Sequence, residues 1–306
     1  MSLQPPSANA EHRQGIVLAA SGVLVLSFDA LLVRLAGVDP WTVVFWRGML
    51  MALSLSAILL LGGKLQLLPL LRRYWPCILL LATLHGVNGT LFVLSVSLTS
   101  AANTVVILSS SAFFAAFFSW VLLRERVQRR TWAAIGVSLT GVLTVFAGSL
   151  GLESWLGDLL ALILALSMGL VLSLMRRFNQ IPRMPIVALS GLVMMALALP
   201  YSTPLPLATN EFAWLALMGL VQIPLASVLI MSSTRHLSSP EVSLFLLIET
   251  VLAPIWVWMA LNEQVPPMTL VGGFIILAAI AVHSWLSLRK PNRAFAEPGL
   301  ADEPTV

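Results

Sequence analysis

The stretch "WMALNEQVPPMT" (258–269) resembles an earlier stretch of the same chain, "WVLLRERVQRRT" (120–131). Just upstream of the two stretches, Ser100 of "LTSAANTVV" corresponds to Ser238 of "LSSPEVSLF" at the same offset of 138 positions. Recurrence at a constant offset is the signature of an internal repeat, which predicts that the chain consists of two related halves. At that offset the identical pairs in the quoted stretches are Trp120/Trp258, Leu123/Leu261, Glu125/Glu263, Val127/Val265 and Thr131/Thr269.

The starts of the two halves also correspond, at an offset of 142 positions. Gly15, Leu18, Ala19 and Arg34 there match Gly157, Leu160, Ala161 and Arg176. We therefore expect a polar N-terminal tail (1–14), a first repeat (15–150), a second repeat (151–288) and a polar C-terminal tail (289–306).

The composition places both repeats in a lipid bilayer. Of the 306 residues, 58% are hydrophobic and 10% are charged, and the mean hydropathy is +0.94. Soluble proteins carry roughly 25% charged residues, so the chain is predicted to be a polytopic membrane protein. The net charge of +4 comes from arginines in short loops between apolar segments. Such a distribution reflects the topology of a membrane protein, so we expect no nucleic-acid partner.

The apolar segments have the length of membrane-spanning helices. A hydrocarbon core about 30 Å thick requires roughly 20 residues of helix. The predicted fold is therefore all-α, with ten transmembrane helices and short connections. The expected spans are 15–37, 41–62, 75–97, 102–123, 131–150, 156–175, 184–201, 212–234, 240–261 and 267–288.

The distribution of arginine and lysine predicts the orientation, because these residues are enriched in cytoplasmic loops. With both termini in the cytoplasm, 15 of the 17 basic residues lie inside, and the two exceptions are Arg34 and Arg47. The acidic residues Asp39, Glu153, Asp158, Glu211 and Glu263 then belong to the outer loops. We expect a multi-pass protein of the plasma (inner) membrane.

An odd number of spans in each repeat reverses the direction of the second copy. Glu125 is then inside and Glu263 outside, as the charges of the loops already require. Inverted repeats are the architecture of many secondary transporters, because two pseudo-symmetric halves can exchange conformations and so alternate access to a central site.

Four segments of the chain resemble the drug/metabolite transporter superfamily, in its ten-helix EamA-type branch. They are "GIVLAASGVLVLSFDALLVRLAGVDPWTVVFWRGMLMAL" (15–53), "LTSAANTVVILSSSAFFAAFFSWVLLRERV" (98–127), "GDLLALILALSMGLVLSLMRRF" (157–178) and "HLSSPEVSLFLLIETVLAPIWVWMALNEQV" (236–265). The resemblance covers about residues 15–288. It implies helices of both halves around a central cavity, with the last span of each half at the periphery.

The resemblance also implies a function. Members of the branch export amino acids, nucleobases and other small metabolites, and the chain is most similar in character to the YddG-like aromatic amino-acid exporters. It therefore implies a small-molecule substrate and a multi-pass exporter that is not an enzyme.

Ionisable residues inside spans are functional-site candidates, because a charge at bilayer depth costs several kcal/mol unless it faces protein or water. Glu249 lies in "LFLLIETVLAPIWVW" (244–258), five residues before Pro254 and seven before Trp256. Glu249 and Trp256 share a helical face, and Pro254 is expected to kink the helix. The face is either a cavity wall or the site of a structural acid that is paired or protonated.

A second candidate stripe lies in the third span. His85 and Asn88 are spaced i, i+3, and Phe92 continues the same face. The stripe indicates either a cavity lining or an interhelical hydrogen bond. No second histidine or cysteine lies nearby in the sequence, so no metal site is expected. Ser110 in "LSSSAFFAAFF" (108–118) belongs either to a hydroxyl-lined cavity wall or to a helix-packing surface. Gln222 and Pro224 are expected to lie in the eighth span at a depth similar to that of His85, and an irregular helix there points to the midplane site of a repeat transporter.

Asp29, Arg47 and the neighbouring Trp46 in the first two spans have two interpretations each. Asp29 is either paired with Arg34 within the first span or a carboxylate that couples transport to an ion. Arg47, six residues into its span, is expected to have a structural or interfacial role. Its neighbour Trp46 is either an anchor or part of the cavity lining. "TLVGGF" (269–274) is expected to pack against another helix, and a homodimer through this face is one interpretation.

The sequence therefore predicts a secondary transporter that exports small metabolites, with neutral or aromatic amino acids as the expected substrates. Trp46, Phe92 and Trp256 would stack on the substrate, and His85, Asn88, Ser110, Gln222 and Glu249 would bind its polar groups. Asp29 and Glu249 are the candidates for ion coupling. A passive facilitator and an exporter of nucleobases are the alternatives. The sequence contains no HExxH, GxSxG or phosphate-binding loop motif, so we expect no enzyme, no cofactor and no fused ATPase.

Overall fold

A computed structural model describes residues 8–62, 72–124, 129–149, 154–178, 180–233 and 239–288. The described chain is helical and contains no strand. The residues Glu125, Glu153 and Ser238, and the two polar tails before residue 8 and after residue 288, lie outside the described ranges.

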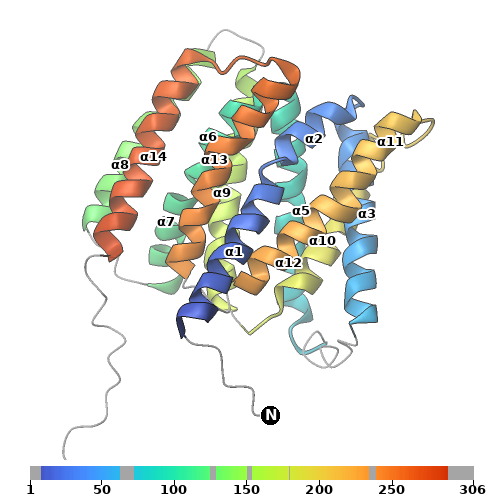
Figure 1. Cartoon of the computed structure of the whole chain (residues 1–306), viewed down its shortest axis with the longest axis horizontal. Coiled ribbons are helices and arrows are strands. Elements are labelled where there is room, and N and C mark those ends of the chain that lie inside the picture. Colours follow the sequence, from blue (N-terminus) through green and yellow to red (C-terminus); the bar gives the residue numbers. More distant parts are fainter. Residues whose placement is uncertain are drawn as a thin grey trace, which may run out of the picture.

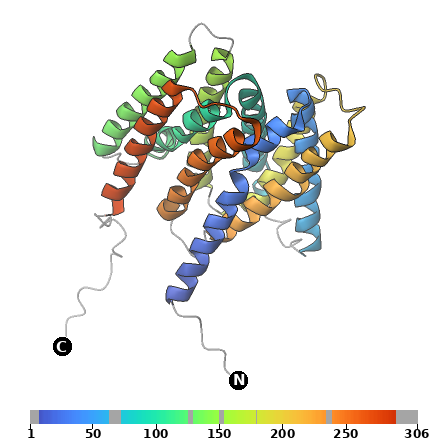
Figure 2. The ribbon, with the colours of Figure 1, turned by 45° about the horizontal axis from the view of Figure 1, so that its top comes forward.

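Helices occupy every predicted span. Within the described ranges, seven helices are long and apolar enough to cross a membrane, and three shorter apolar helices coincide with the remaining spans. α1 begins and α14 ends on the same side of the bundle (Figures 1 and 2). The elements are α1 (Ala8–Leu26), α2 (Asp29–Ala36), α3 (Pro40–Leu61), α5 (Trp75–Leu98), α6 (Ala101–Ser109), α7 (Ser111–Leu123), α8 (Arg129–Ser149), α9 (Trp155–Arg177), α10 (Arg183–Ala198), α11 (Thr209–Ala216), the π-helix η2 (Leu217–Gln222), α12 (Ile223–Ser233), α13 (Ser239–Leu261) and α14 (Pro267–Leu288).

Three of the predicted spans are interrupted. The first divides into α1 and α2 at Ser27–Phe28, and the fourth divides into α6 and α7 at Ser110. The serine hydroxyls of both breaks donate to carbonyls three residues earlier, at 2.7 Å for Ser27 and 2.6 Å for Ser110, a local bond that competes with the regular helix. The eighth span widens into η2 just before Pro224, which lacks the N–H that a regular turn requires. By contrast, α13 continues through Pro254.

The packing of the helices follows the internal repeat. The two most extensive contacts join α3 to α10 and α8 to α14, which are the second and fifth spans of the two repeats. Contacts between non-equivalent spans also occur in related pairs, since α5 packs on α9 and α1 packs on α12. The structure therefore has the pseudo-symmetry that two repeats require, with α8 and α14 at one edge of the bundle (Figure 1).

Glycine pairs bring the equivalent spans close together. A Cβ atom on Gly191 would lie 2.5 Å from the carbonyl oxygen of Gly48, and a Cβ on Gly272 would lie 2.5 Å from that of Gly141. Small residues permit such close helix crossings in membranes. Gly272 belongs to the "TLVGGF" stretch, so the predicted packing role of this stretch is confirmed by its contact with α8.

Candidate functional site

A buried ion pair links α2 to α3 near the centre of the bundle. Arg47 donates from Nη1 to Oδ1 of Asp29 and from Nη2 to Oδ2, both at 2.9 Å. The side chains are 9% and 8% exposed. A bidentate arginine–carboxylate pair is among the stronger charge-assisted interactions, and each charge compensates the other at a depth where neither is tolerated alone.

The pairing overturns the expected Asp29–Arg34 pair and agrees with the structural alternative of the two roles expected for Arg47. Asp29 does not pair with Arg34, because five residues along a helix turn the two side chains onto different faces. Arg47 does not reach the membrane interface, because Asp29, one span away, holds its guanidinium inside the bundle. Its role is structural in the sense that it neutralises a buried carboxylate.

Residues of both repeats surround this pair. The guanidinium carbon of Arg47 lies 5.6 Å from the centre of the Phe92 ring, on α5. Nη1 of Arg47 also contacts the sulfur of Met218 at 3.7 Å, on η2. His85 lies two helical turns before Phe92 on the same face of α5, and α5 packs on α3, which carries Arg47. The predicted His85–Phe92 stripe therefore faces the ion pair.

Glu249 of α13 lies on another side of the ion pair. Asp29, Arg47, His85 and Glu249 together are called the polar cluster below. α13 packs on α2, whose first residue is Asp29. The side chain of Glu249 is partly exposed, and within the described residues it forms no hydrogen bond or ion pair. Glu249 is thus a partly exposed carboxyl group within a predicted span, without a protein partner in the described ranges.

A side chain of the second repeat forms hydrogen bonds with the backbone at the break in the first span. Gln222 donates from Nε2 to the carbonyls of Val25 and Leu26, at 3.3 and 3.4 Å. These carbonyls lie just before the break. A helix interruption inside a bilayer requires such partners, because lipid offers none. The predicted site residue Gln222 therefore supports the segment that presents Asp29.

An indole of the second repeat holds the break from another side. Trp256 donates from Nε1 to the hydroxyl of Ser27 at 2.9 Å. Its ring stacks on Phe28 with the ring centres 4.8 Å apart. Trp256 thus lies beside the cluster, but its indole N–H is bonded to Ser27 and one face of its ring is covered by Phe28.

Three further predicted residues lie at separate places. Asn88 is buried on α5 and donates to the sulfur of Met168 at 3.8 Å. Ser110 is buried at the break between α6 and α7. Trp46 donates from its indole N–H to the carbonyl of Pro204 at 3.0 Å, which makes it an anchor for the loop between α10 and α11.

Several buried side-chain atoms around the cluster lack a hydrogen-bond partner within the described residues. They are Nε of Arg47, Nδ1 of His85, Oδ1 of Asn88 and Oε1 of Gln222. Buried polar atoms are nearly always satisfied by protein, water or ligand. These atoms on α3, α5 and η2 are therefore available to water or to a polar ligand.

The sequence profile of the EamA-like transporter family matches this chain twice, over residues 13–147 and 155–285. This chain belongs to the EamA-like transporter family. The two matches confirm the two repeats, and the family consists of transporters rather than enzymes.

The structural comparison agrees on the fold. A solved crystal structure matches with a TM-score of 0.66 and 18% sequence identity, covering 91% of this chain and all of the other. At this identity the likeness shows the fold alone. No curated protein matches this sequence.

In this EamA-like protein, both matched regions contribute to the cluster. Asp29, Arg47 and His85 belong to the first, and Gln222 and Glu249 belong to the second. The ion pair is therefore surrounded by residues of both repeats.

The end of the EamA-like bundle where α2 ends and α6 and α14 begin carries a second polar network that the sequence did not reveal. Nη2 of Arg34 lies 3.4 Å from Oε2 of Glu263 and donates a hydrogen bond to the carbonyl oxygen of Thr99 at 2.8 Å. Glu263 in turn accepts from the backbone N–H of Ala101 at 3.0 Å, at the start of α6. Arg34 and Glu263 thus connect the end of the first span to the turn before the last span.

Asp158 anchors this network from α9. Its carboxylate accepts from the Thr99 hydroxyl at 2.6 Å and from the Asn103 amide at 3.0 Å. Asn103 also accepts from Thr269 of α14. Asp158 is fully buried, so its assignment to an outer loop was wrong. Its place in the first turn of a span was the signal, because a carboxylate there stabilises a helix N-terminus.

Proposed function

We propose that this protein is a secondary transporter that exports neutral or aromatic amino acids by alternating access across the inner membrane. Both termini would face the cytoplasm. The observation that carries the proposal is the cluster of ionisable groups, Asp29, Arg47, His85 and Glu249, at the meeting of the two repeats. In transporters built from inverted repeats, substrate and coupling-ion sites lie near the midplane, beside interrupted helices.

The chemistry of the cluster suits a zwitterion with an apolar side chain. A substrate ammonium group would bind the carboxylate of Glu249, which has no protein partner in the described residues. The substrate carboxylate would accept hydrogen bonds from the Nε of Arg47 and from His85, whose Nδ1 is buried and unsatisfied. Phe92 and Trp256 would contact the side chain.

Glu249 is also the preferred coupling residue of this proposal. Asp29 is already neutralised by Arg47 through two hydrogen bonds, so it has little freedom to exchange a proton. Glu249 has no such partner among the described residues. Binding of a proton at Glu249 would compete with binding of the substrate ammonium group, which is a direct way to couple export to proton entry.

The test is transport by the full chain in proteoliposomes with a panel of amino acids and nucleobases, with and without a pH gradient. We expect gradient-driven accumulation of neutral or aromatic amino acids. Glu249→Gln is expected to abolish the gradient-driven component, because the amide does not exchange a proton. Glu211→Gln is the matched control, since Glu211 only accepts a hydrogen bond from Ala208 at the outer end.

The contrary outcomes are distinct. Unchanged gradient-driven transport by Glu249→Gln would refute the role of Glu249. Transport that equilibrates a substrate without responding to the gradient would identify a passive facilitator. Accumulation of nucleobases alone would refute the assigned substrate class.

A further inference from the structure

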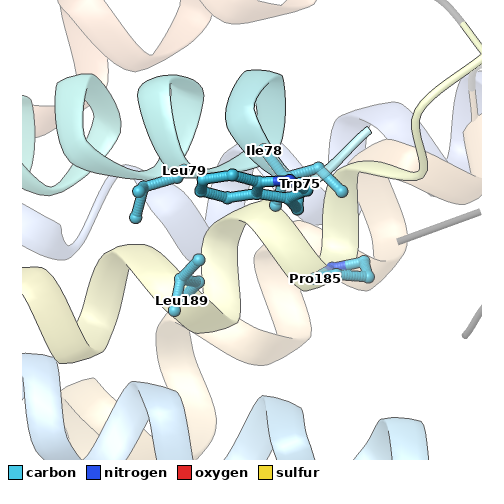
Figure 3. A pocket seen from close by; sticks show the side chains of 5 residues that line it. All are labelled: Trp75, Ile78, Leu79, Pro185 and Leu189. Atoms are coloured by element: carbon cyan, nitrogen blue, oxygen red, sulfur yellow. The ribbon is translucent and has the colours of Figure 1, made fainter. Parts of the chain in front are cut away.

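A groove lies on the surface between α5 and α10, apart from the polar cluster. It has a volume of about 370 Å³ and is lined by Trp75, Ile78 and Leu79 of α5 and by Pro185 and Leu189 of α10 (Figure 3). Every lining side chain is apolar. The indole of Trp75 is 62% exposed and Leu79 is 46% exposed, so the groove opens toward the surroundings of the bundle rather than into its core.

The groove lies near one end of the bundle. Trp75 is the first residue of α5, and Pro185 is the third residue of α10. The two helix starts are joined by a hydrogen bond in which the Tyr74 hydroxyl donates to Oε1 of Gln180 at 3.4 Å. The groove therefore begins where the apolar span meets the polar boundary, the depth at which tryptophan side chains concentrate in membrane proteins.

Three arginines flank this end of the groove. Arg72 and Arg73 immediately precede α5, and Arg183 is the first residue of α10. All three are exposed. Within the described ranges, no ion pair joins any of them to a carboxylate. The groove is thus apolar along its length and has an excess of positive charge at its polar end.

Both helix N-termini add to this positive field. Neither Tyr74 before α5 nor Pro182 before α10 provides a side-chain cap. Uncapped N–H groups and the helix dipole favour an anion at this position.

We propose that this groove binds a phospholipid with an anionic headgroup. One acyl chain would lie along Ile78, Leu79 and Leu189, with the Trp75 ring at headgroup level. The phosphate would bind Arg72 and Arg183, with Arg73 beside them. Basic pockets between transmembrane helices bind anionic headgroups in this manner. An apolar lining without polar groups does not recognise a hydrophilic substrate, so this site differs from the transport cluster.

The occupant would connect two helices that support the transport cluster. α5 carries His85 and Phe92, and α10 packs on α3 beside Arg47 through Gly191 and Gly48. The bound lipid is therefore expected to stabilise the pairing of α5 with α10 in the folded protein.

The experiment measures lipid binding to the full chain in detergent. Phosphatidylglycerol and phosphatidylcholine with identical acyl chains are titrated separately, with native mass spectrometry and the melting temperature as readouts. We expect tight retention and thermal stabilisation with phosphatidylglycerol. Arg72→Gln/Arg183→Gln is expected to weaken its binding roughly tenfold, since each basic residue near an anionic headgroup contributes on the order of a tenfold change or less.

The control removes the same charge elsewhere. Arg13 and Arg129 are exposed residues of α1 and α8, and Arg13→Gln/Arg129→Gln is expected to change the affinity less than about twofold, since neither residue flanks the groove. A third variant, Leu79→Trp, narrows the groove and keeps the arginines. It is expected to weaken binding of phosphatidylglycerol and to leave the binding of glycerol phosphate unchanged.

Three results would overturn the proposal. Equal losses in the two arginine double variants would show diffuse charge attraction. Equal binding of phosphatidylcholine would show that the headgroup charge is irrelevant. Binding of glycerol phosphate as tight as that of the lipid would identify an anion site without an acyl chain. None of these readouts depends on transport, so the proposal stands or falls separately from the proposed function.

Discussion

Asp29→Asn is expected to lower the free energy of unfolding by about 3–5 kcal/mol, which is the usual cost of removing one partner of a buried ion pair. The substitution leaves Arg47, a residue that is only 8% exposed, without a counter-charge for its guanidinium. The expected cost is larger than that of an ordinary lost hydrogen bond because the remaining charge is desolvated. The measurement is thermal or denaturant unfolding of the purified protein in a defined detergent.

A double-mutant cycle separates the pair from the individual side chains. Asp29→Asn/Arg47→Met removes both charges, and we expect it to recover most of the stability lost by the single Asp29 variant, because a buried pair is often replaceable by apolar or neutral groups. If the double variant is as unstable as the sum of the two single variants, the two residues do not stabilise each other and the ion pair is not the source of the effect.

The Arg34–Glu263 pair provides an internal comparison. Its side chains are 28% and 25% exposed, so water screens the two charges. Glu263→Gln retains an oxygen that can accept from Ala101 and loses only the ion pair. We expect a change of about 0–1 kcal/mol, as for other exposed pairs. Because both pairs join an arginine to a carboxylate, the difference between the two losses of stability tests whether burial makes the Asp29–Arg47 pair the more costly one to break.

The sequence was sufficient to predict the helices and the repeat. Apolar runs of bilayer length are a property of composition, and each of the ten predicted spans contains a helix. The correspondence of Glu125 with Glu263 predicted two halves, and the two family matches confirm them. The peripheral position of α8 and α14 followed from the family resemblance.

The partners of the charged residues could not be predicted. Asp29 lies five residues from Arg34 and 18 residues from Arg47, yet it pairs with the more distant one. The pairing depends on how α2 is tilted after the break at Ser27–Phe28, and the break depends on Gln222 and Trp256 of the other repeat. Such contacts are tertiary, and no local pattern encodes them.

Local breaks were only partly visible in the sequence. Pro224 indicated an irregular eighth span, which contains η2. The run of serines around Ser110 was interpreted as a wall or packing surface, but its hydroxyls bond to local carbonyls where the span divides. Serine is common in regular transmembrane helices, so its presence alone does not predict an interruption.

Gly191→Ala is expected to destabilise the protein by about 1–3 kcal/mol, the range for overpacking a close contact. The new Cβ would lie 2.5 Å from the carbonyl oxygen of Gly48 and 2.9 Å from the backbone nitrogen of Ala52. Both contacts are with backbone atoms, so a side-chain rotation does not relieve them and α10 has to move away from α3.

Gly136→Ala is the matched control, because a Cβ on Gly136 of α8 meets nothing within 4 Å. Without a clash, alanine should stabilise that helix by up to about 1 kcal/mol through its higher helix propensity. The same exchange thus has opposite expected signs at two helix positions. Equal melting temperatures for the two variants would contradict the close crossing.

The Gly191 variant also tests whether the crossing positions the ion pair. Arg47 directly precedes Gly48 on α3, so a displacement of α3 from α10 moves the guanidinium relative to Asp29. We expect Gly191→Ala to reduce transport by a larger factor than Gly136→Ala when both are assayed at a temperature where each remains folded. Normal transport by a destabilised Gly191→Ala protein would show that the crossing supports the fold without positioning the cluster.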